Sequence, residues 1–82
     1  MRRNKFLWYV IAPLVMQAYQ LTNREGEITQ CVLRGWSTAE ISARLHITLN
    51  TVQDHLKAIF EKVGVNSRGE LAARIFAGHY QP

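Results

Sequence analysis

The sequence predicts a single all-α domain, and three observations lead to that class. Hydroxyl residues are followed three positions later by glutamate, as in the capping box of a helix N-terminus, at Thr22, Ser37 and Ser67. Apolar residues after these caps recur at helical spacing, and no stretch alternates apolar and polar residues as a half-buried strand does. A chain of 82 residues, 48% of them hydrophobic, can bury one modest core.

The first twenty residues form a segment of their own, in which a basic tip precedes an apolar run over residues 6–16. We expect a packing or linker helix there, kinked or begun near Pro13. The run is shorter than the ~20 residues of a membrane span, and no A-x-A-like cleavage site follows it. A membrane-surface anchor and a signal sequence remain as alternatives. The expected packing face consists of Leu7, Val10, Ile11, Leu14, Val15 and Ala18.

Residues 21–82 are expected to form the main domain, with four helices at residues 23–34, 38–45, 49–63 and 68–77. Gly35, Gly64 and Gly78 stand just past three of these ends. Glycine is favoured there because a C-cap often needs a left-handed backbone.

The predicted helix 49–63 has two contrasting faces, and Thr48 is placed to cap it. The preceding helix, 38–45, is separated from it only by a short turn, and such a pair is typical of a helix-turn-helix. The buried stripe is expected to contain Val52, Leu56, Ile59 and Val63. The opposite, polar face is expected to contain Asn50, Asp54, Lys57 and Glu61.

The charge is unevenly distributed. The chain carries +4, but Arg2, Arg3 and Lys5 supply most of this, and the part from Leu21 onward carries only +1. Sequence-independent affinity for nucleic acid comes mainly from neutralising phosphates. Affinity would therefore have to come from geometry, from dimerisation or from the basic tip.

Several functional classes have no support in the sequence. There is no Gly-rich phosphate loop, no pair of carboxylates placed for catalysis and no nucleophile beside a base, so we predict no enzyme and no cofactor. His46, His55 and His79 lack the spacing of a zinc site, and we expect no metal. The single cysteine, Cys31, is either a core residue or a reactive thiol.

Four motifs together resemble the LuxR-type (GerE/FixJ/NarL-like) helix-turn-helix domain of bacterial transcription regulators. They are L-T-x-R-E-x-E-I from Leu21, G-x-S-x-x-E-I-x-x-x-L from Gly35, T-V-x-x-H-x-x-x-I-x-x-K-x-x-V from Thr51, and S-R-x-E-L from Ser67. The resemblance implies a four-helix DNA-binding output domain whose third helix enters the major groove of double-stranded DNA. It also implies a cytoplasmic protein, without a small-molecule ligand in this segment, that acts alone or as the tail of a longer regulator.

The resemblance assigns roles to individual residues. Base-reading positions fall on Gln53, Asp54 and Lys57. The last helix is implied as the site of homodimerisation, and an exposed phenylalanine is expected on its contact face. Helical spacing places Ala72, Phe76 and His79 together on that face. Phosphate contacts are expected at Thr48, Asn50, Thr51, His55 and Lys62.

The chain departs from the usual motif at three positions, Thr29, Gly69 and Asp54. At the position of Thr29 the family generally has leucine. Asp54 could accept a hydrogen bond from cytosine or select against wrong bases. Two further questions remain open, one about Glu25 and Arg68 and one about Trp36. Glu25 and Arg68 either link the first and last helices of the domain or are simply solvated.

Trp36 is read as a lid on the core, with a ligand-stacking role as the alternative. Two alternative functions also remain: a protein-interaction module that binds a partner regulator, and a sigma-factor region 4. The latter would not explain the motifs that begin at Thr51 and Ser67.

Overall fold

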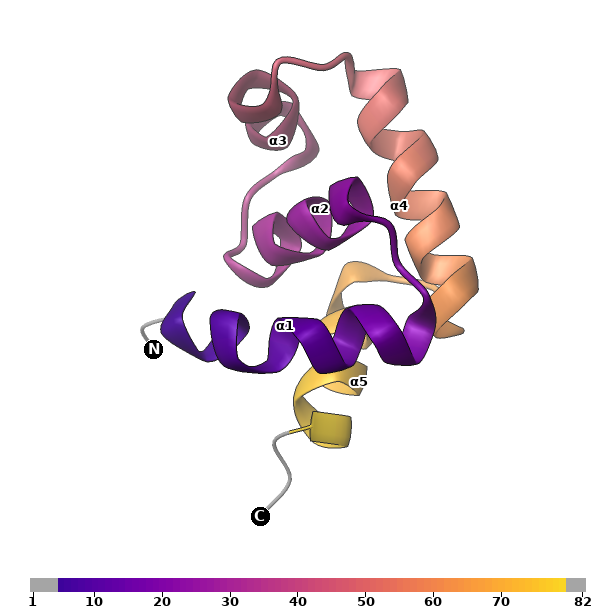
Figure 1. The fold of residues 1–82 in the computed structure, drawn as a ribbon. Coiled ribbons are helices and arrows are strands. Elements are labelled where there is room, and N and C mark those ends of the chain that lie inside the picture. Colours follow the sequence, from indigo (N-terminus) through magenta and orange to yellow (C-terminus); the bar gives the residue numbers. More distant parts are fainter. Residues whose placement is uncertain (1–4, 80–82) are drawn as a thin grey trace.

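The computed structural model describes residues 5–79, with side chains for residues 8–76, and this part of the chain contains helices and no strand. The all-α prediction is confirmed, and helices 38–45 and 49–63 have their predicted bounds. The helices are α1 (Lys5–Tyr19), α2 (Asn23–Leu33), α3 (Thr38–Leu45), α4 (Leu49–Val63) and α5 (Arg68–His79) (Figure 1).

Two of the three predicted capping boxes are complete. The Thr22 hydroxyl accepts a hydrogen bond from the Glu25 amide at 3.1 Å, and the Glu25 carboxylate accepts one from the Thr22 amide at 2.9 Å. Ser37 and Glu40 repeat this arrangement at 3.1 and 2.8 Å. Each pair satisfies two of the amides that a helix start leaves without partners, which explains why α2 and α3 begin where predicted.

The prediction for the last helix was partly wrong. The Ser67 hydroxyl accepts a hydrogen bond from the Glu70 amide at 3.1 Å, but the Glu70 carboxylate accepts one from the Asn66 amide at 2.8 Å instead of returning to Ser67. The helix also continues through Gly78, so that glycine does not end it as a C-cap.

The turn between α3 and α4 depends on a backbone conformation that the sequence did not reveal. His46 ends α3 with a φ of 59°, a left-handed value that non-glycine residues rarely adopt. The Ile47 amide donates to the Ser42 carbonyl at 3.1 Å, and the Ser42 hydroxyl donates to the Ile47 carbonyl. These bonds hold the turn that sets α3 against α4.

Gly64 ends α4 as predicted, with a φ of 82° and its amide donating to Phe60. We expect Gly64→Ala to lower the free energy of unfolding by about 1–2 kcal/mol, because the left-handed conformation strains any L-residue. Urea denaturation measures the loss. Gly69→Ala is the control, since Gly69 lies in α5 and an added Cβ would meet only the Ser67 hydroxyl at 3.9 Å. That variant should be neutral or stabilised by up to about 1 kcal/mol, and equal losses in both would contradict the strain argument.

One hydrophobic core joins all five helices. α2 contacts α1, α4 and α5, and α3 packs against α4. The buried hydroxyl of Thr29, a departure from the family motif, donates to the Glu25 carbonyl at 2.8 Å and so needs no further partner. The largest fully buried side chains are Val15, Ile28, Thr29, Ile41, Val52, Ile59, Leu71 and Ile75.

The predicted packing face of α1 was partly wrong. Ile11 and Val15 are buried as predicted, but Trp8 is buried as well, so the buried side of α1 is rotated toward Trp8 relative to the predicted face. Since α1 is apolar nearly all round, periodicity could not choose its buried side. The positions wrongly placed in the core, all of which are exposed, are Val10, Leu14 and Ala18.

The contact between α1 and α2 is close because Gly26 has no side chain. A Cβ at Gly26 would lie 2.8 Å from the Met16 sulfur. Pro13 lies inside α1, so the helix does not begin there. The predicted contact of Leu7 and the basic tip Met1–Lys5 fall outside the described side chains. Within residues 5–79, every helix is too short or too polar to cross a membrane.

Candidate nucleic-acid interface

The polar face of α4 is exposed, opposite a stripe that the core buries. All four residues predicted for the stripe are buried, which fixes the rotation of the helix about its axis. Burial of this stripe holds α4 firmly on α2 and α3. The side chains left exposed on α4 include Asn50, Gln53, Asp54, Lys57 and Glu61.

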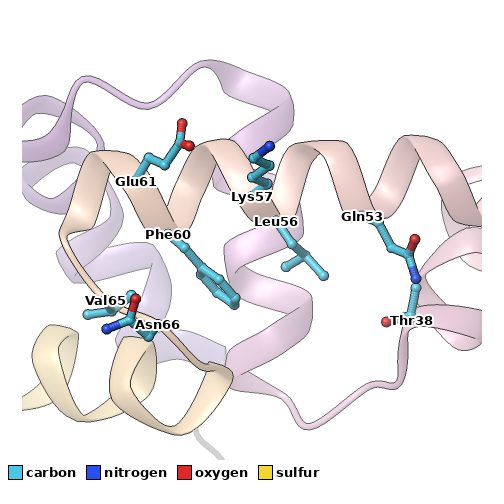
Figure 2. A pocket seen from close by; sticks show the side chains of 8 residues that line it. All are labelled: Thr38, Gln53, Leu56, Lys57, Phe60, Glu61, Val65 and Asn66. Carbon is cyan, nitrogen blue, oxygen red and sulfur yellow. The ribbon is translucent and has the colours of Figure 1, made fainter.

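An open groove of about 480 Å³ runs beside this face, between α4, the start of α3 and the loop that leads to α5. Figure 2 shows Leu56 and Phe60 pointing into the groove and Gln53 reaching toward Thr38, while Lys57 and Glu61 point away from it. The groove therefore has an apolar floor and polar edges. Its lining is Thr38, Gln53, Leu56, Lys57, Phe60, Glu61, Val65 and Asn66.

The structure brings two of the three predicted base-reading residues together. Gln53 and Lys57 both line the groove and are exposed. Asp54 is exposed on the same helix but does not line the groove. A ligand lying along α4 could meet all three side chains, but of the three only Gln53 reaches across the groove, because Lys57 lies at its edge and points away from it.

The predicted phosphate contacts near the start of α4 are in different environments. Thr48 and Asn50 are exposed, while Thr51 and His55 are half-buried. The Thr48 hydroxyl caps α4 by accepting from the Thr51 amide at 3.1 Å, and it lies 2.9 Å from the Thr51 hydroxyl. Thr48 therefore fixes the helix start, whatever else it contacts.

Lys62, the remaining predicted phosphate contact, is engaged within the fold. Its ammonium nitrogen lies 2.7 Å from a carboxylate oxygen of Glu25 and donates to the Gln20 carbonyl at 3.1 Å. Burial on its own raises the pKa of Glu25, but hydrogen bonds from Lys62 and from the Thr22 amide, with the charge of Lys62, bring it below its usual value. The Glu25 carboxylate therefore stays ionised inside the fold.

The expected link between Glu25 and Arg68 was wrong, because Glu25 pairs with Lys62. Arg68 donates instead to the Trp36 carbonyl at 2.6 Å and to the Thr38 hydroxyl at 2.8 Å. It ties the start of α5 to the start of α3 and thereby positions one wall of the groove.

Trp36 is half-buried and packs against the core, as a lid would. The guanidinium carbons of Arg34 and Arg44 lie 5.2 and 4.0 Å from the centre of its ring. These cation–π contacts use part of the ring surface that a stacked ligand would need.

Most cations of the described domain also make contacts within the fold. Lys62, Arg68 and Arg74 bind carbonyl or carboxylate oxygens. Arg24 pairs with Glu27 at 3.2 Å. Among the exposed residues of α4, Lys57 is the one cation not engaged in this way, and it faces solvent with two carboxylates. Lys57 is thus the cation that the polar face of α4 offers to an anionic ligand, and Arg34 and Arg44 are exposed beside Trp36.

Two residues of the groove, Thr38 and Asn66, were missed at the sequence level. Thr38 is the first residue of α3, and Asn66 belongs to the short polar connection before α5. The helix-turn-helix pattern itself contains a signal for Thr38, because it sets the start of its first helix beside the second. Asn66 lies near α4 only through the chain reversal at Gly64, and no local pattern predicts that.

The predicted dimer face on α5 is less open than expected. Ala72 and Phe76 are half-buried and pack against the core, so the prediction of an exposed phenylalanine was wrong. α1 lies against α5, which Figure 1 shows crossing beneath it. The side chain of His79 falls outside the described part.

The part of the chain that the structure describes contains neither a cluster of metal ligands nor an exposed thiol. No group of three or more His, Cys, Asp or Glu side chains there could hold a metal ion. Cys31 is buried, and this burial raises the pKa of its thiol. A raised thiol pKa favours the unreactive protonated form, so the core reading of Cys31 fits the structure.

Comparison with known proteins identifies the family. The model of bacterial regulatory proteins of the luxR family matches residues 19–75. A probable transcriptional regulatory protein, SgaR of Hyphomicrobium methylovorum, is 42% identical over 65% of this chain and 25% of its own length. The transcriptional regulatory protein UhpA of Escherichia coli K12 is 38% identical over 71% of this chain and 30% of its own.

The response regulator VraR of Staphylococcus aureus Mu3 is 38% identical over 68% of this chain and 27% of its own length. The chain thus spans between a quarter and a third of the curated relatives it matches. No solved structure gave a significant match. With the family model covering more than half of the chain, this protein belongs to the luxR family of bacterial regulatory proteins and carries its DNA-binding helix-turn-helix domain.

Proposed function

We propose that this chain reads specific sequences in double-stranded DNA, in the bacterial cytoplasm, as the output module of a transcription regulator. The supporting observation is the way in which the rest of the domain holds α4. A buried stripe and the hydrogen-bonded turn before it hold the helix in place, and its polar face is exposed. A helix presented in this way fits the width of the major groove.

Several polar residues at or near α4 have a role in this proposal. Gln53 offers a bidentate amide to adenine, Lys57 offers an ammonium to guanine, and Asp54 can accept a hydrogen bond from cytosine. Phosphates flank the helix start, where we place Thr48, Asn50, Thr51 and His55. Lys62 uses two donors inside the fold and keeps a third N–H for a phosphate.

Gln53→Ala and Lys57→Ala should each weaken binding to the preferred sequence while leaving the fold intact. A good base contact contributes about 1–3 kcal/mol, so a loss of at least several-fold in affinity is expected, with relaxed preference at one base pair. Selection from random oligonucleotides, followed by titration in gel shifts, measures both effects. The control is Glu27→Ala, which removes an exposed ion pair on α2. Unchanged target selection in both variants would overturn the base-reading assignment.

Two copies are needed in this proposal, because so weakly charged a domain cannot bind one half-site tightly. We place the contact between copies on the side of the domain that α5 forms, with Ala72, Phe76 and His79. The proposed half-sites are inverted and about one helical turn apart. An upstream signal-receiving part, if the native protein has one, would set when the module binds.

One observation favours a second candidate, the binding of a partner regulator instead of DNA. The outward face of α4 carries Asp54 and Glu61 against the single cation Lys57. A surface of this charge suits a basic protein patch. Gel shifts with random-sequence and selected duplexes decide between the two, because only the DNA reader gives a salt-dependent shift with sequence preference.

A further inference from the structure

We propose that Arg34, Trp36 and Arg44 form a docking site for an acidic segment of a second protein, whose aspartate or glutamate side chains meet the two guanidinium groups. The site lies outside the polar face of α4, so the inference goes beyond the proposed function. It is also distinct from the outward face of α4, whose charge suits a basic partner.

The indole of Trp36 gathers two arginine side chains from different elements. The guanidinium carbon of Arg44, on α3, lies 4.0 Å from the centre of the ring, and that of Arg34, just after α2, lies 5.2 Å from it. Laid end to end these distances reach about 9 Å, so the two positive charges are no farther apart than that. Both arginines are exposed. The cluster is therefore a compact, accessible pair of cations.

Neither guanidinium group binds a carboxylate or carbonyl oxygen in the part of the chain that the structure describes. Glu40, one turn before Arg44, accepts instead from the Ser37 amide at 2.8 Å. Glu27 of α2 pairs with Arg24 at 3.2 Å. Each arginine has N–H donors in a fixed fork that matches the two oxygens of a carboxylate. The cluster thus offers two complete sets of charged donors to a ligand.

The platform beneath the two arginines is held on several sides. The Trp36 carbonyl accepts a hydrogen bond from Arg68 at 2.6 Å, and the next residue, Ser37, caps α3. The ring of Trp36 is half-buried and packs against the core. Stacking on this ring restricts both guanidinium groups before a ligand arrives, so less conformational freedom is lost on binding.

The cluster faces away from the surface proposed to read DNA. Thr38 and Ser42 mark the side of α3 toward α4, since Thr38 lines the groove and Ser42 bonds the turn. Helical geometry sets Arg44 roughly 120° around α3 from Thr38 and roughly 160° from Ser42. Figure 1 shows the connection from α2 to α3 at the left of the domain and α4 at the right. A duplex on α4 leaves the cluster open, which favours a protein ligand over a DNA phosphate.

The spacing of the two cations suits a peptide chain. An extended segment sets side chains two positions apart on the same side, about 6–7 Å from one another. Two carboxylates at that spacing can each meet one guanidinium group of the cluster. We therefore expect a segment in which aspartate or glutamate occupies alternate positions.

Titration of the isotope-labelled full chain with a synthetic peptide of alternating glutamate and glycine tests the site by NMR. The indole N–H signal of Trp36 should shift and saturate, whereas that of Trp8, which is buried in the core, should stay in place. A peptide with glutamine at every glutamate position should cause no shift. An unmoved Trp36 signal, or equal shifts with both peptides, would overturn the proposal.

Arg34→Gln and Arg44→Gln should each weaken binding of the acidic peptide by about fivefold or more, with little change in the midpoint of urea denaturation. Arg24→Gln is the matched control, because it removes the same charge from an arginine of α2 that pairs with Glu27. That variant should bind within about twofold of the wild type. Equal losses in all three variants would mean that the peptide follows net charge alone, which contradicts a site at Trp36.

A duplex of selected sequence separates this proposal from the proposed function. At physiological ionic strength, the DNA-loaded protein should bind the peptide within about threefold of the affinity of the free protein. Displacement of the peptide by the duplex would assign the cluster to a DNA phosphate and overturn the proposal. Wild-type protein that binds no duplex contradicts the proposed function, whereas the peptide titration still decides on the cluster.

Discussion

Ile59→Ala is expected to lower the free energy of unfolding by about 3–5 kcal/mol, the upper part of the range for truncating a buried aliphatic side chain. Ile59 is fully buried, on the side of α4 that packs against the core. A domain of 82 residues has about 4–12 kcal/mol of stability in total. The variant should therefore lose a large share of its stability, and circular dichroism would show this as lower midpoints of urea and thermal denaturation.

Leu56→Ala serves as the comparison for Ile59→Ala. Leu56 lies on the same stripe but is 8% exposed and lines the open groove. Because the groove admits water where the side chain is removed, less of a closed cavity remains, and a smaller loss of about 2–3 kcal/mol is expected. A larger loss at Leu56 than at Ile59 would mean that the groove is closed in solution.

Lys62→Met should lower the free energy of unfolding by about 2–3 kcal/mol, because it leaves the Glu25 carboxylate buried without its counter-charge. Removing one partner of a fully buried pair costs about 3–5 kcal/mol. The loss here is smaller because the Lys62 side chain is 35% exposed, whereas that of Glu25 is 7% exposed. Methionine keeps most of the aliphatic stem, so packing changes little.

Arg24→Met is the matched control for this pair. Arg24 and Glu27 are 41% and 58% exposed and lie 3.2 Å apart. Exposed pairs of this kind contribute about 0–1 kcal/mol. Urea denaturation of both variants at pH 7 compares them, and similar small losses would show that the Glu25–Lys62 pair does not stabilise the fold.

The same pair predicts a pH dependence. The pKa of Glu25 in the folded chain lies below its ordinary value, so its contribution to stability is present above the unfolded-state pKa and is lost as the pH falls through the folded-state pKa. In Lys62→Met only burial and the cap act, and burial raises the pKa. The difference in stability between wild type and variant should therefore shrink on acidification, in denaturation curves recorded from pH 7 to pH 3.

The sequence predicted α3 and α4 closely because their determinants are local. Ser37 and Thr48 mark the starts, Gly64 marks one end, and a stripe at helical spacing sets the rotation of α4. These features act within a few residues of one another, so they are readable without the tertiary structure.

The features that the sequence did not predict depend on distant contacts or on uniform composition. Lys62 outcompetes Arg68 for Glu25 because the end of α4 lies beside the junction of α1 and α2, which no local pattern reveals. Spacing could not choose the buried side of α1, since nearly every side chain on it is apolar. Phe76 was expected to be exposed because its packing against the core depends on tertiary contacts that spacing along one helix does not show.

The ammonium of Lys62 also has a mechanical consequence. It binds the Gln20 carbonyl, just past the end of α1, and the Glu25 carboxylate in the first turn of α2, while its own backbone belongs to the last turn of α4. Three helices thus meet at one cation, at the end of α4 opposite the helix-turn-helix turn. Loss of this ammonium would therefore release the end of α4 from α1 and from α2 at the same point.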